Sequence, residues 1–446
     1  MRYRTFKMGG VHWDDHKIAA TAAIETFPLP AKVAISMAQH LGAPATPVVA
    51  KGDKVKVGTV IGTPTGFMSG YVHSSVSGTV TAVEPRADII GNKVMHVCID
   101  VEGDEYEEGI FNSDRLEREI KGAPEELLEK IKNAGIVGMG GATFPTHIKL
   151  APPKGKKADI LIINGVECEP YVTADDRLMR EHPHEVVLGA RIMARVLGVD
   201  SIVIAIEENK PEAFSAISEA SLRYVGLDVM MLKKKYPQGG EKQLIDAVTG
   251  RRVPSGALPI DTGCVVQNVA TAFAVYQAVQ KNRPLTERVL TVTGECLQRP
   301  RNFRVRIGTP ISAIIEAVGG LPESAVKVIS GGPMMGKAIA NLDATTQKGT
   351  SCLLMLSAEQ TARTPESACI RCARCAAACP MGLEPWLLNR YGRIGDTAAL
   401  EANRVYDCIE CGCCQSTCPA HIPLLDIVRT GKADVMKIIR ARAKKQ

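Results

Sequence analysis

The sequence has no long hydrophobic run. No stretch approaches the roughly 18 consecutive apolar residues of a membrane-spanning helix, and no apolar segment follows the start of the chain at residues 1–5. We therefore expect neither a membrane anchor nor a signal peptide, and a chain that remains in the cytoplasm.

An excess of one charge sign is also lacking. The 54 Lys and Arg residues and 48 Asp and Glu residues leave a net charge of +6 over 446 residues, so nucleic-acid binding is not indicated. The nine histidines show no metal-ligand spacing. A hydrophobic fraction of 45% and a charged fraction of 23% exclude a disordered or coiled-coil chain. At about 150 residues per domain, the length predicts roughly three domains.

Hydrophobic patterns divide the chain into modules. Valines and glycines alternate from Pro44 to Pro85, which predicts the short strands of a small β-barrel. Three continuous apolar runs then alternate with helical patterns, which predicts a parallel α/β sheet. The runs lie at 159–163, 201–206 and 227–232. A strand, strand and helix pattern at 288–320 and a helical, cysteine-rich module from Ser357 follow, so the predicted fold class is multidomain α/β and α+β.

Nine of the 14 cysteines lie in one short segment near the end of the chain. They contain two copies of the spacing Cys-x2-Cys-x2-Cys-x3-Cys-Pro, which is typical of proteins with two [4Fe-4S] clusters. The first copy is Cys369, Cys372, Cys375 and Cys379, and the second is Cys408, Cys411, Cys414 and Cys418. A zinc site or a set of structural cysteines is disfavoured, because zinc prefers isolated Cys-x2-Cys pairs. Cys413 is out of register with the second copy, and the spacing favours Cys414 as the ligand.

The two motifs are expected to exchange one ligand. In two-cluster ferredoxins the cysteine before proline binds the other cluster. We therefore predict that Cys369, Cys372 and Cys375 share a cluster with Cys418. The other cluster is predicted to bind Cys408, Cys411, Cys414 and Cys379.

Two polar loops flank the first predicted strand of the α/β sheet. The loop before it contains Gly138, Gly140 and Gly141 and is followed by Lys149, a pattern that suits either a phosphate cradle or a plain turn. The loop after it runs from 164 to 170 and contains two glutamates. Acids at a strand's carboxyl end suit ribose hydroxyls or a nicotinamide amide, and a solvated loop is the alternative.

Four motifs resemble those of the NADH-binding flavoprotein subunit of respiratory complex I, in the same order. They are Gly-Met-Gly-Gly-Ala-Thr-Phe-Pro-Thr from 138, Asn-Gly-Val-Glu-Cys-Glu-Pro from 164, Tyr-Pro-Gln-Gly-Gly-Glu-Lys-Gln-Leu from 236 and Gln-Asn-Val-Ala-Thr from 267. The resemblance implies that FMN is held by Gly138, Gly140, Gly141, Lys149, Asn164 and Asn268. It also implies that the flavin and nicotinamide are faced by Glu167, Glu169 and Glu241. The chain departs from the family pattern at Met139, Val166, Tyr171 and Lys242.

Over nearly its full length the chain resembles the C subunit of the Rnf (Rsx) ion-translocating electron-transport complex. The resemblance includes the start Gly-Gly-Val-His at 9–12 and Gln-His-Leu-Gly-Ala-Pro at 39–44, whereas the segment 13–17 diverges. It implies four domains. They are a barrel-sandwich hybrid at 1–110, a Rossmann-like FMN/NADH-binding domain at 120–285, a soluble-ligand-binding β-grasp (SLBB) domain at 286–345 and a two-cluster ferredoxin-type domain at 357–446.

This family resemblance implies a peripheral oxidoreductase subunit on the cytoplasmic side of a membrane complex. Such a subunit exchanges electrons between NAD(H) and two [4Fe-4S] clusters through FMN. Its expected partners are other Rnf subunits, including an iron–sulfur subunit, and ferredoxin indirectly, with Na⁺ or H⁺ moved by those subunits. The alternatives are a soluble flavo-iron-sulfur protein of the cobalamin reductase type and a relay that binds no nucleotide.

Overall fold

The computed structural model describes residues 3–443, and its centre is a parallel four-stranded sheet of order β11-β10-β9-β12. The strands are Ile160–Gly165 (β9), Ser201–Glu207 (β10), Leu227–Leu232 (β11) and Cys264–Asn268 (β12). Apolar side chains on both faces of these strands are buried, as expected for a parallel sheet covered on two sides. Because all four strands run the same way, their carboxyl ends lie at one edge.

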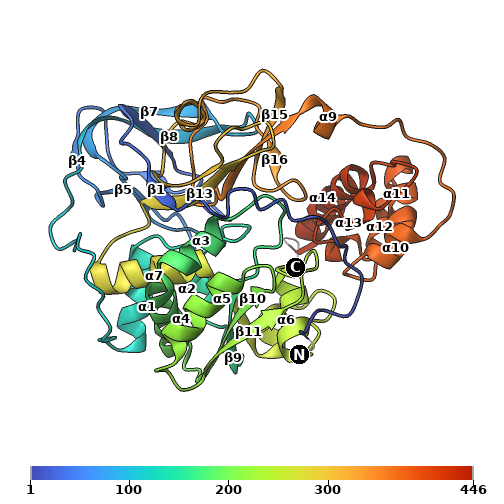
Figure 1. The fold of residues 1–446 in the computed structure, drawn as a ribbon, viewed down its shortest axis with the longest axis horizontal. Helices are drawn as coiled ribbons and strands as arrows, with labels where there is room; N and C mark the ends of the chain where they lie inside the picture. Colours follow the sequence, from blue (N-terminus) through green and yellow to red (C-terminus); the bar gives the residue numbers. More distant parts are fainter. Residues whose placement is uncertain (1–2, 444–446) are drawn as a thin grey trace.

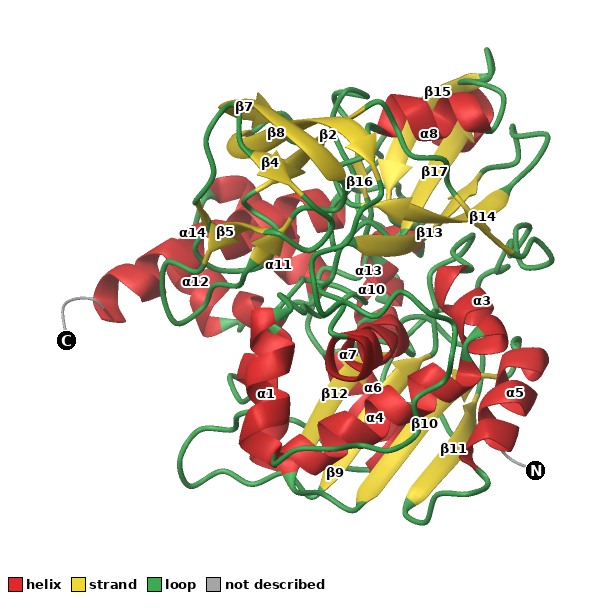
Figure 2. Cartoon of the chain, turned by 90° about the vertical axis from the view of Figure 1, so that its left-hand side faces the viewer, coloured by secondary structure: helices red, strands yellow, loops and turns green. Residues whose placement is uncertain are grey.

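Helices cover the two faces of this sheet unequally (Figure 2). One face packs against the larger set, α1 (Pro124–Asn133), α3 (Ala174–Glu181), α4 (Pro183–Leu197), α5 (Pro211–Ser221) and α7 (Val269–Lys281). The other face packs against α6 (Glu241–Thr249) and the side chain of Phe6, from the start of the chain. Two short helices, α2 (Thr146–Lys149) and η1 (Pro259–Thr262), precede β9 and β12.

The barrel consists of two small antiparallel sheets. One has the order β2-β8-β7-β4, and the other has the order β3-β5-β6. Their strands are Lys32–Ser36 (β2), Thr46–Pro47 (β3), Lys54–Val55 (β4), Val60–Thr63 (β5), Val72–His73 (β6), Ser77–Ala87 (β7) and Lys93–Gly103 (β8). Figure 1 shows them above the central module, beside a third sheet.

The third sheet is mixed and has the order β1-β14-β13-β17-β15-β16. Its strands are Ile24–Thr26 (β1), Glu287–Thr293 (β13), Arg301–Arg306 (β14), Ala325–Ser330 (β15), Lys337–Ala338 (β16) and Cys352–Ser357 (β17), with α8 (Ile311–Ala317) against it. The strands β1 and β17 lie outside the range 286–345. This sheet therefore takes a strand from the start of the chain, parallel to β14.

The cysteine-rich module is helical and lies to one side of the molecule (Figure 1). Its helices are α10 (Arg374–Ala378), α11 (Pro385–Ile394), α12 (Thr397–Ala402), η2 (Val405–Asp407), α13 (Cys413–Ser416) and α14 (Leu424–Ala443), and α9 (Ala358–Thr361) precedes it. Leu388, Leu400 and Val428 form its core together with Val405 and Val435. Cys375 lies in α10 and Cys413 and Cys414 lie in α13, whereas the other motif cysteines lie outside the helices.

A buried lysine joins three of the modules. Lys348 is 1% exposed, and its Nζ donates hydrogen bonds to the carbonyl oxygens of Tyr71 (2.8 Å) and Gly135 (2.7 Å). Burial lowers the pKa of Lys348 to about 7. The barrel, the third sheet and the central module are thus held in a fixed arrangement around one side chain.

Candidate functional site

Two asparagines mark the carboxyl ends of the two neighbouring strands β9 and β12. Asn164 and Asn268 are register partners at the ends of these strands. The Asn268 Oδ1 caps α7 by accepting a hydrogen bond from the Ala270 amide at 2.9 Å, and its Nδ2 donates to Asp175 at 2.6 Å. Asn164 Nδ2 donates to the Gly239 carbonyl oxygen at 2.9 Å. The strand edge, the start of α7 and the loop before α6 therefore meet at these two side chains.

The glycine loop lies against the same edge. A Cβ atom at Gly140 would come within 2.9 Å of Asn268 Nδ2, whereas one at Gly141 would meet nothing within 4 Å. Thr271 Oγ1 accepts a hydrogen bond from the Met139 amide, and Arg288 donates to the Met139 carbonyl, each at 2.9 Å. The loop is thus anchored through Met139, while the backbone at Gly141 is open to a ligand.

Lys149 and Glu241 form an ion pair at this site. Lys149 Nζ lies 2.5 Å from Glu241 Oε1, and the two side chains are 32% and 37% exposed. Glu241 is the first residue of α6, so the pair lies at a helix N-terminus. Two helix N-termini, a lysine and an open glycine backbone suit the phosphate of FMN. The residues present therefore fit this cofactor.

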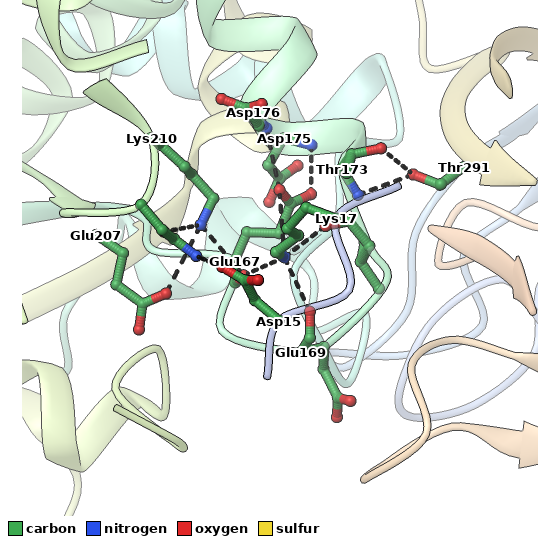
Figure 3. A network of polar contacts seen from close by, with 12 residues as sticks. Asp15, Lys17, Glu167, Glu169, Thr173, Asp175, Asp176, Glu207, Lys210 and Thr291 are labelled. Carbon is green, nitrogen blue, oxygen red and sulfur yellow. Dashed lines mark hydrogen bonds and ion pairs between the residues drawn. The ribbon is translucent and has the colours of Figure 1, made fainter. Parts of the chain in front are cut away.

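The other two predicted glutamates direct their carboxylates elsewhere (Figure 3). Glu167 accepts hydrogen bonds from the amides of Asp175 (2.7 Å) and Asp176 (3.2 Å), so it caps α3. Glu169 accepts hydrogen bonds from the amides of Met334 (3.1 Å) and Met335 (2.9 Å), in the turn after β15. Glu241 thus lies beside Lys149, whereas Glu167 and Glu169 bind backbone amides of the surrounding framework.

Burial shifts the acids of this region toward the protonated form. It raises the pKa of Glu169 to about 7 and the pKa values of Asp175 and Asp176 to about 6. The negative charge of Glu167 adds to the effect on both aspartates. Asp175 accepts the hydrogen bond from Asn268, and this bond connects the buried acids to the edge of the sheet.

Four of the cluster cysteines share one cavity. Cys379, Cys408, Cys411 and Cys414 all line one pocket, whose other walls include Leu388 and Val428. This set unites three thiols of the second motif with the proline-linked thiol of the first. The two-cluster spacing assigns these same four cysteines to one cluster, and that assignment stays a prediction.

The remaining cysteines of the two motifs lie nearer the surface. Cys375 and Cys418 pack beside Ala420 and Ile422, whereas Cys369 and Cys372 are exposed. Burial, with the nearby charge of Cys418, raises the pKa of the Cys375 thiol. Cys413 does not line the cavity and packs instead against Val11 and Tyr236.

The four thiols of this pocket match the ligand set of a cubane, which needs one thiolate for each of four irons. The residues that line the pocket between the two motifs therefore fit a [4Fe-4S] cluster.

Comparison with protein-family models divides the chain into four matches. Residues 5–105 match the RnfC barrel sandwich hybrid domain and residues 131–277 match the Nuo51 FMN-binding domain. Residues 289–338 match the SLBB domain, and residues 363–419 match a 4Fe-4S dicluster domain. The predicted fold class and the predicted classes of resident cofactor, FMN and [4Fe-4S] clusters, are confirmed.

Curated relatives cover most of the chain. The C subunit of the Na⁺-translocating ferredoxin:NAD⁺ oxidoreductase complex of Acetobacterium woodii is 42% identical over 98% of both chains. The C subunit of the proton-translocating complex of Clostridium ljungdahlii is 47% identical over 86% of this chain and 84% of its own. The chain belongs to the family of Rnf C subunits. The corresponding subunit of the ion-translocating oxidoreductase complex of Rhodobacter capsulatus is 42% identical over 87% of this chain and 75% of its own.

For this Rnf protein, no helix among residues 3–443 is long and apolar enough to cross a membrane. The cytoplasmic side of the membrane stays a prediction.

Sequence reasoning missed several residues that organise the site. Asp175 and Asp176 stand in the first turn of α3, where acids are favoured, and that local signal was available. Lys17 and Lys210 gave no such signal. They bind the carbonyl oxygens of the loop after β9 from opposite sides, and only the folded chain brings Lys17 to that loop.

Proposed function

We propose that this Rnf protein exchanges electrons between NAD(H) at the strand edge and the two [4Fe-4S] clusters of its helical module. It would do so on the cytoplasmic side of a membrane complex whose other subunits, including an iron–sulfur subunit, move Na⁺ or H⁺ and reach ferredoxin. The observation that carries the proposal is a direct contact between the two sites. Tyr236, in the loop before α6, donates a hydrogen bond from its hydroxyl to the Cys411 carbonyl oxygen at 2.9 Å.

The residues of the strand edge have separate tasks in this proposal. FMN, when bound, supplies the change from a two-electron hydride to single electrons. Gly138, Gly140 and Gly141 let the backbone approach its phosphate, and Lys149 supplies a positive charge there. Asn164 and Asn268 orient the flavin at the strand ends, and Glu241 faces the nicotinamide. Glu167 and Glu169 shape the site through the amides that they bind.

The two clusters differ in burial, and this difference suggests the order in which electrons pass through them. The cavity formed by Cys379, Cys408, Cys411 and Cys414 adjoins the flavin domain, because Cys411 contacts Tyr236 and Gln243 Nε2 donates to the Pro380 carbonyl at 3.3 Å. The exposed Cys369 and Cys372 lie at the outer cluster. Electrons would therefore leave the flavin domain at the buried cluster and reach a partner at the exposed one.

The decisive experiment adds NADH to the anaerobically purified protein and follows flavin and cluster absorbance. We expect bound FMN, bleaching of the flavin and then reduction of the clusters. If NADH bleached neither flavin nor clusters, the protein would be an electron relay that binds no nucleotide. If the purified protein also contained no FMN, the proposed flavin site would be wrong. Co-purification with membrane subunits separates the Rnf assignment from a soluble cobalamin reductase.

A matched pair of lysine variants tests the phosphate site. Lys149→Met should lower FMN retention, whereas Lys156→Met should leave it unchanged. Lys156 Nζ also lies 2.5 Å from a carboxylate, that of Asp261, but at the opposite end of the sheet, before β9 and β12. Equal FMN content in both variants would contradict the role of Lys149.

A further inference from the structure

The start of the chain runs between the flavin domain and the cluster module before it enters the barrel (Figure 1). Near its beginning, the backbone of Arg4 pairs with Leu232, the last residue of β11, and Phe6 is buried against the sheet. The following residues, 9–17, form an extended arm. Contacts from this arm reach the flavin domain, the segment that carries Cys379 and, through His16, Glu295 after β13.

The first half of the arm touches the buried cluster site. The Gly10 amide donates to the Ala378 carbonyl oxygen at 2.9 Å, directly before Cys379. Gly9 has φ +63°, and a Cβ atom there would lie 2.4 Å from the Cys379 carbonyl oxygen. This contact therefore requires the lack of a side chain, and the positive φ also favours glycine at this position.

The middle of the arm pairs with the loop before α6. Val11 and Tyr236 exchange two backbone hydrogen bonds, of 2.8 and 2.9 Å. Tyr236 in turn holds the Cys411 carbonyl through its hydroxyl. The arm, the flavin domain and the cluster loop thus share one small set of hydrogen bonds.

The second half of the arm is hydrogen-bonded to the loop after β9 (Figure 3). Lys17 Nζ donates to the carbonyl oxygens of Glu167 (2.8 Å), Glu169 (2.9 Å) and Val172 (2.5 Å). The Tyr171 amide donates to the Asp15 carbonyl at 2.9 Å. Glu167 and Tyr171 have φ of +46° and +70°, which non-glycine residues rarely adopt. Such a loop persists only where its surroundings hold it.

We propose that residues 9–17 are a tie that fixes the buried cluster against the flavin site, with Gly9 and Lys17 as its two anchor points. Lys17 is a positioning residue, because it acts through the backbone of the loop after β9. Gly9 positions the cluster through the Cys379 peptide. The inference rests on the proposed function for its consequence, electron transfer, but the tie itself is a property of this chain alone.

The test compares Gly9→Ala with Gly52→Ala in the complete, cluster-loaded protein. Gly52 also has positive φ, +98°, but a Cβ atom there meets nothing within 4 Å, so this variant carries the backbone strain without the clash. We expect Gly9→Ala to keep its FMN and iron, to accept electrons from NADH at the normal rate and to slow cluster reduction several-fold, because electron transfer weakens steeply as the distance between flavin and cluster grows. Gly52→Ala should leave both rates unchanged.

Lysine variants examine the other anchor. Lys17→Met and Lys210→Met each remove a lysine that binds the loop after β9, but only Lys17 belongs to the arm. Both should increase amide hydrogen exchange in residues 165–173, and only Lys17→Met should also increase it at Gly10, Val11 and Tyr236. Exchange is measured without nucleotide, so its result is independent of whether NADH reduces the flavin.

Two outcomes would overturn the tie. One is a cluster reduction rate and exchange pattern in Gly9→Ala equal to those of Gly52→Ala. The other is an identical pattern of amide hydrogen exchange in Lys17→Met and Lys210→Met. This second comparison still tests the tie if Gly9→Ala loses its clusters. A wild-type protein without NADH-reducible flavin would instead overturn the proposed function and leave the exchange comparison valid.

Discussion

The two predicted cluster sites draw on motifs of the same spacing and have very different surroundings. Cys411 and Cys379 are buried, and their peptides contact Tyr236 and the arm at 9–17. Cys369 and Cys372 are exposed at the outer end of the module. Identical ligand patterns thus produce one cluster site enclosed by the rest of the chain and one open to other molecules.

This difference separates an inner from an outer electron-transfer position. Contacts from the flavin domain, the arm and the turn containing Met334 surround the inner site, since Met334 also lies against Gly412. The outer site has the exposed Ile370 between two of its cysteines. Cluster properties depend on exposure and hydrogen bonding around the sulfurs, so the two clusters should differ despite equal ligands.

Removal of one ligand from each site should give the largest effect. Cys411→Ala should lose the inner cluster and therefore abolish cluster reduction by the flavin, because each iron of the cubane needs its cysteine ligand. Cys372→Ala should keep flavin-driven reduction of the inner cluster and lose only transfer to an external acceptor. Stopped-flow absorbance and electron paramagnetic resonance on anaerobic samples distinguish the two.

The comparison would fail if the two variants behaved alike. Equal loss of flavin-driven reduction in Cys372→Ala would mean that the outer cluster receives the electrons first. Cys296→Ala serves as the control, because Cys296 lies in the third sheet's module, away from both motifs.

The cysteine spacing and the parallel strands could be read from the sequence because both are local patterns. The exchange of Cys379 and Cys418 also follows from local spacing, through the chemistry of two-cluster proteins. The role of Glu167 could not be read in the same way. It caps a helix that begins several residues later, and this depends on the positive φ at Glu167 and Tyr171.

The arm was unpredictable for a different reason. Lys17 binds carbonyl oxygens 150 to 155 positions further along the chain, and backbone carbonyls leave no mark in the side-chain sequence. Gly9 looks like any loop glycine until Cys379 is placed against it. Long-range contacts through the backbone therefore account for most of what sequence reasoning missed at this site.

Glu169 provides a pH-dependent test of the inner region. Its pKa is raised from 4.5 to about 7 by burial, so the folded chain binds a proton that the unfolded chain has released. The stability from this group is present below pH 4.5 and is lost as the pH rises through about 7. The stability of Glu169→Gln relative to wild type should therefore increase by on the order of 3 kcal/mol as the pH rises over this range, on top of a pH-independent cost because the amide can accept only one of the two backbone hydrogen bonds.

Denaturant unfolding at several pH values measures this difference. Glu359→Gln, in the exposed α9, is the control and should run parallel to wild type. If the free energy of unfolding of Glu169→Gln also ran parallel to that of wild type at all pH values, Glu169 would not take up a proton on folding. A pH-dependent increase in stability in Glu169→Gln alone would assign the proton uptake to Glu169, beside the inner cluster.

Cys413 supplies the smallest effect and the sharpest check on ligand assignment at the inner site. Its side chain is 0% exposed and packs against Val11 and Tyr236, while its neighbour Cys414 lines the cavity. Cys413→Ala should keep all iron and both cluster signals and cost about 1 kcal/mol of stability from lost packing. Cys414→Ala should lose the inner cluster. If Cys413→Ala lost iron and Cys414→Ala kept it, Cys413 and not Cys414 would be the ligand of the inner cluster. The arm would then contact a cluster ligand directly, through Val11 and Cys413.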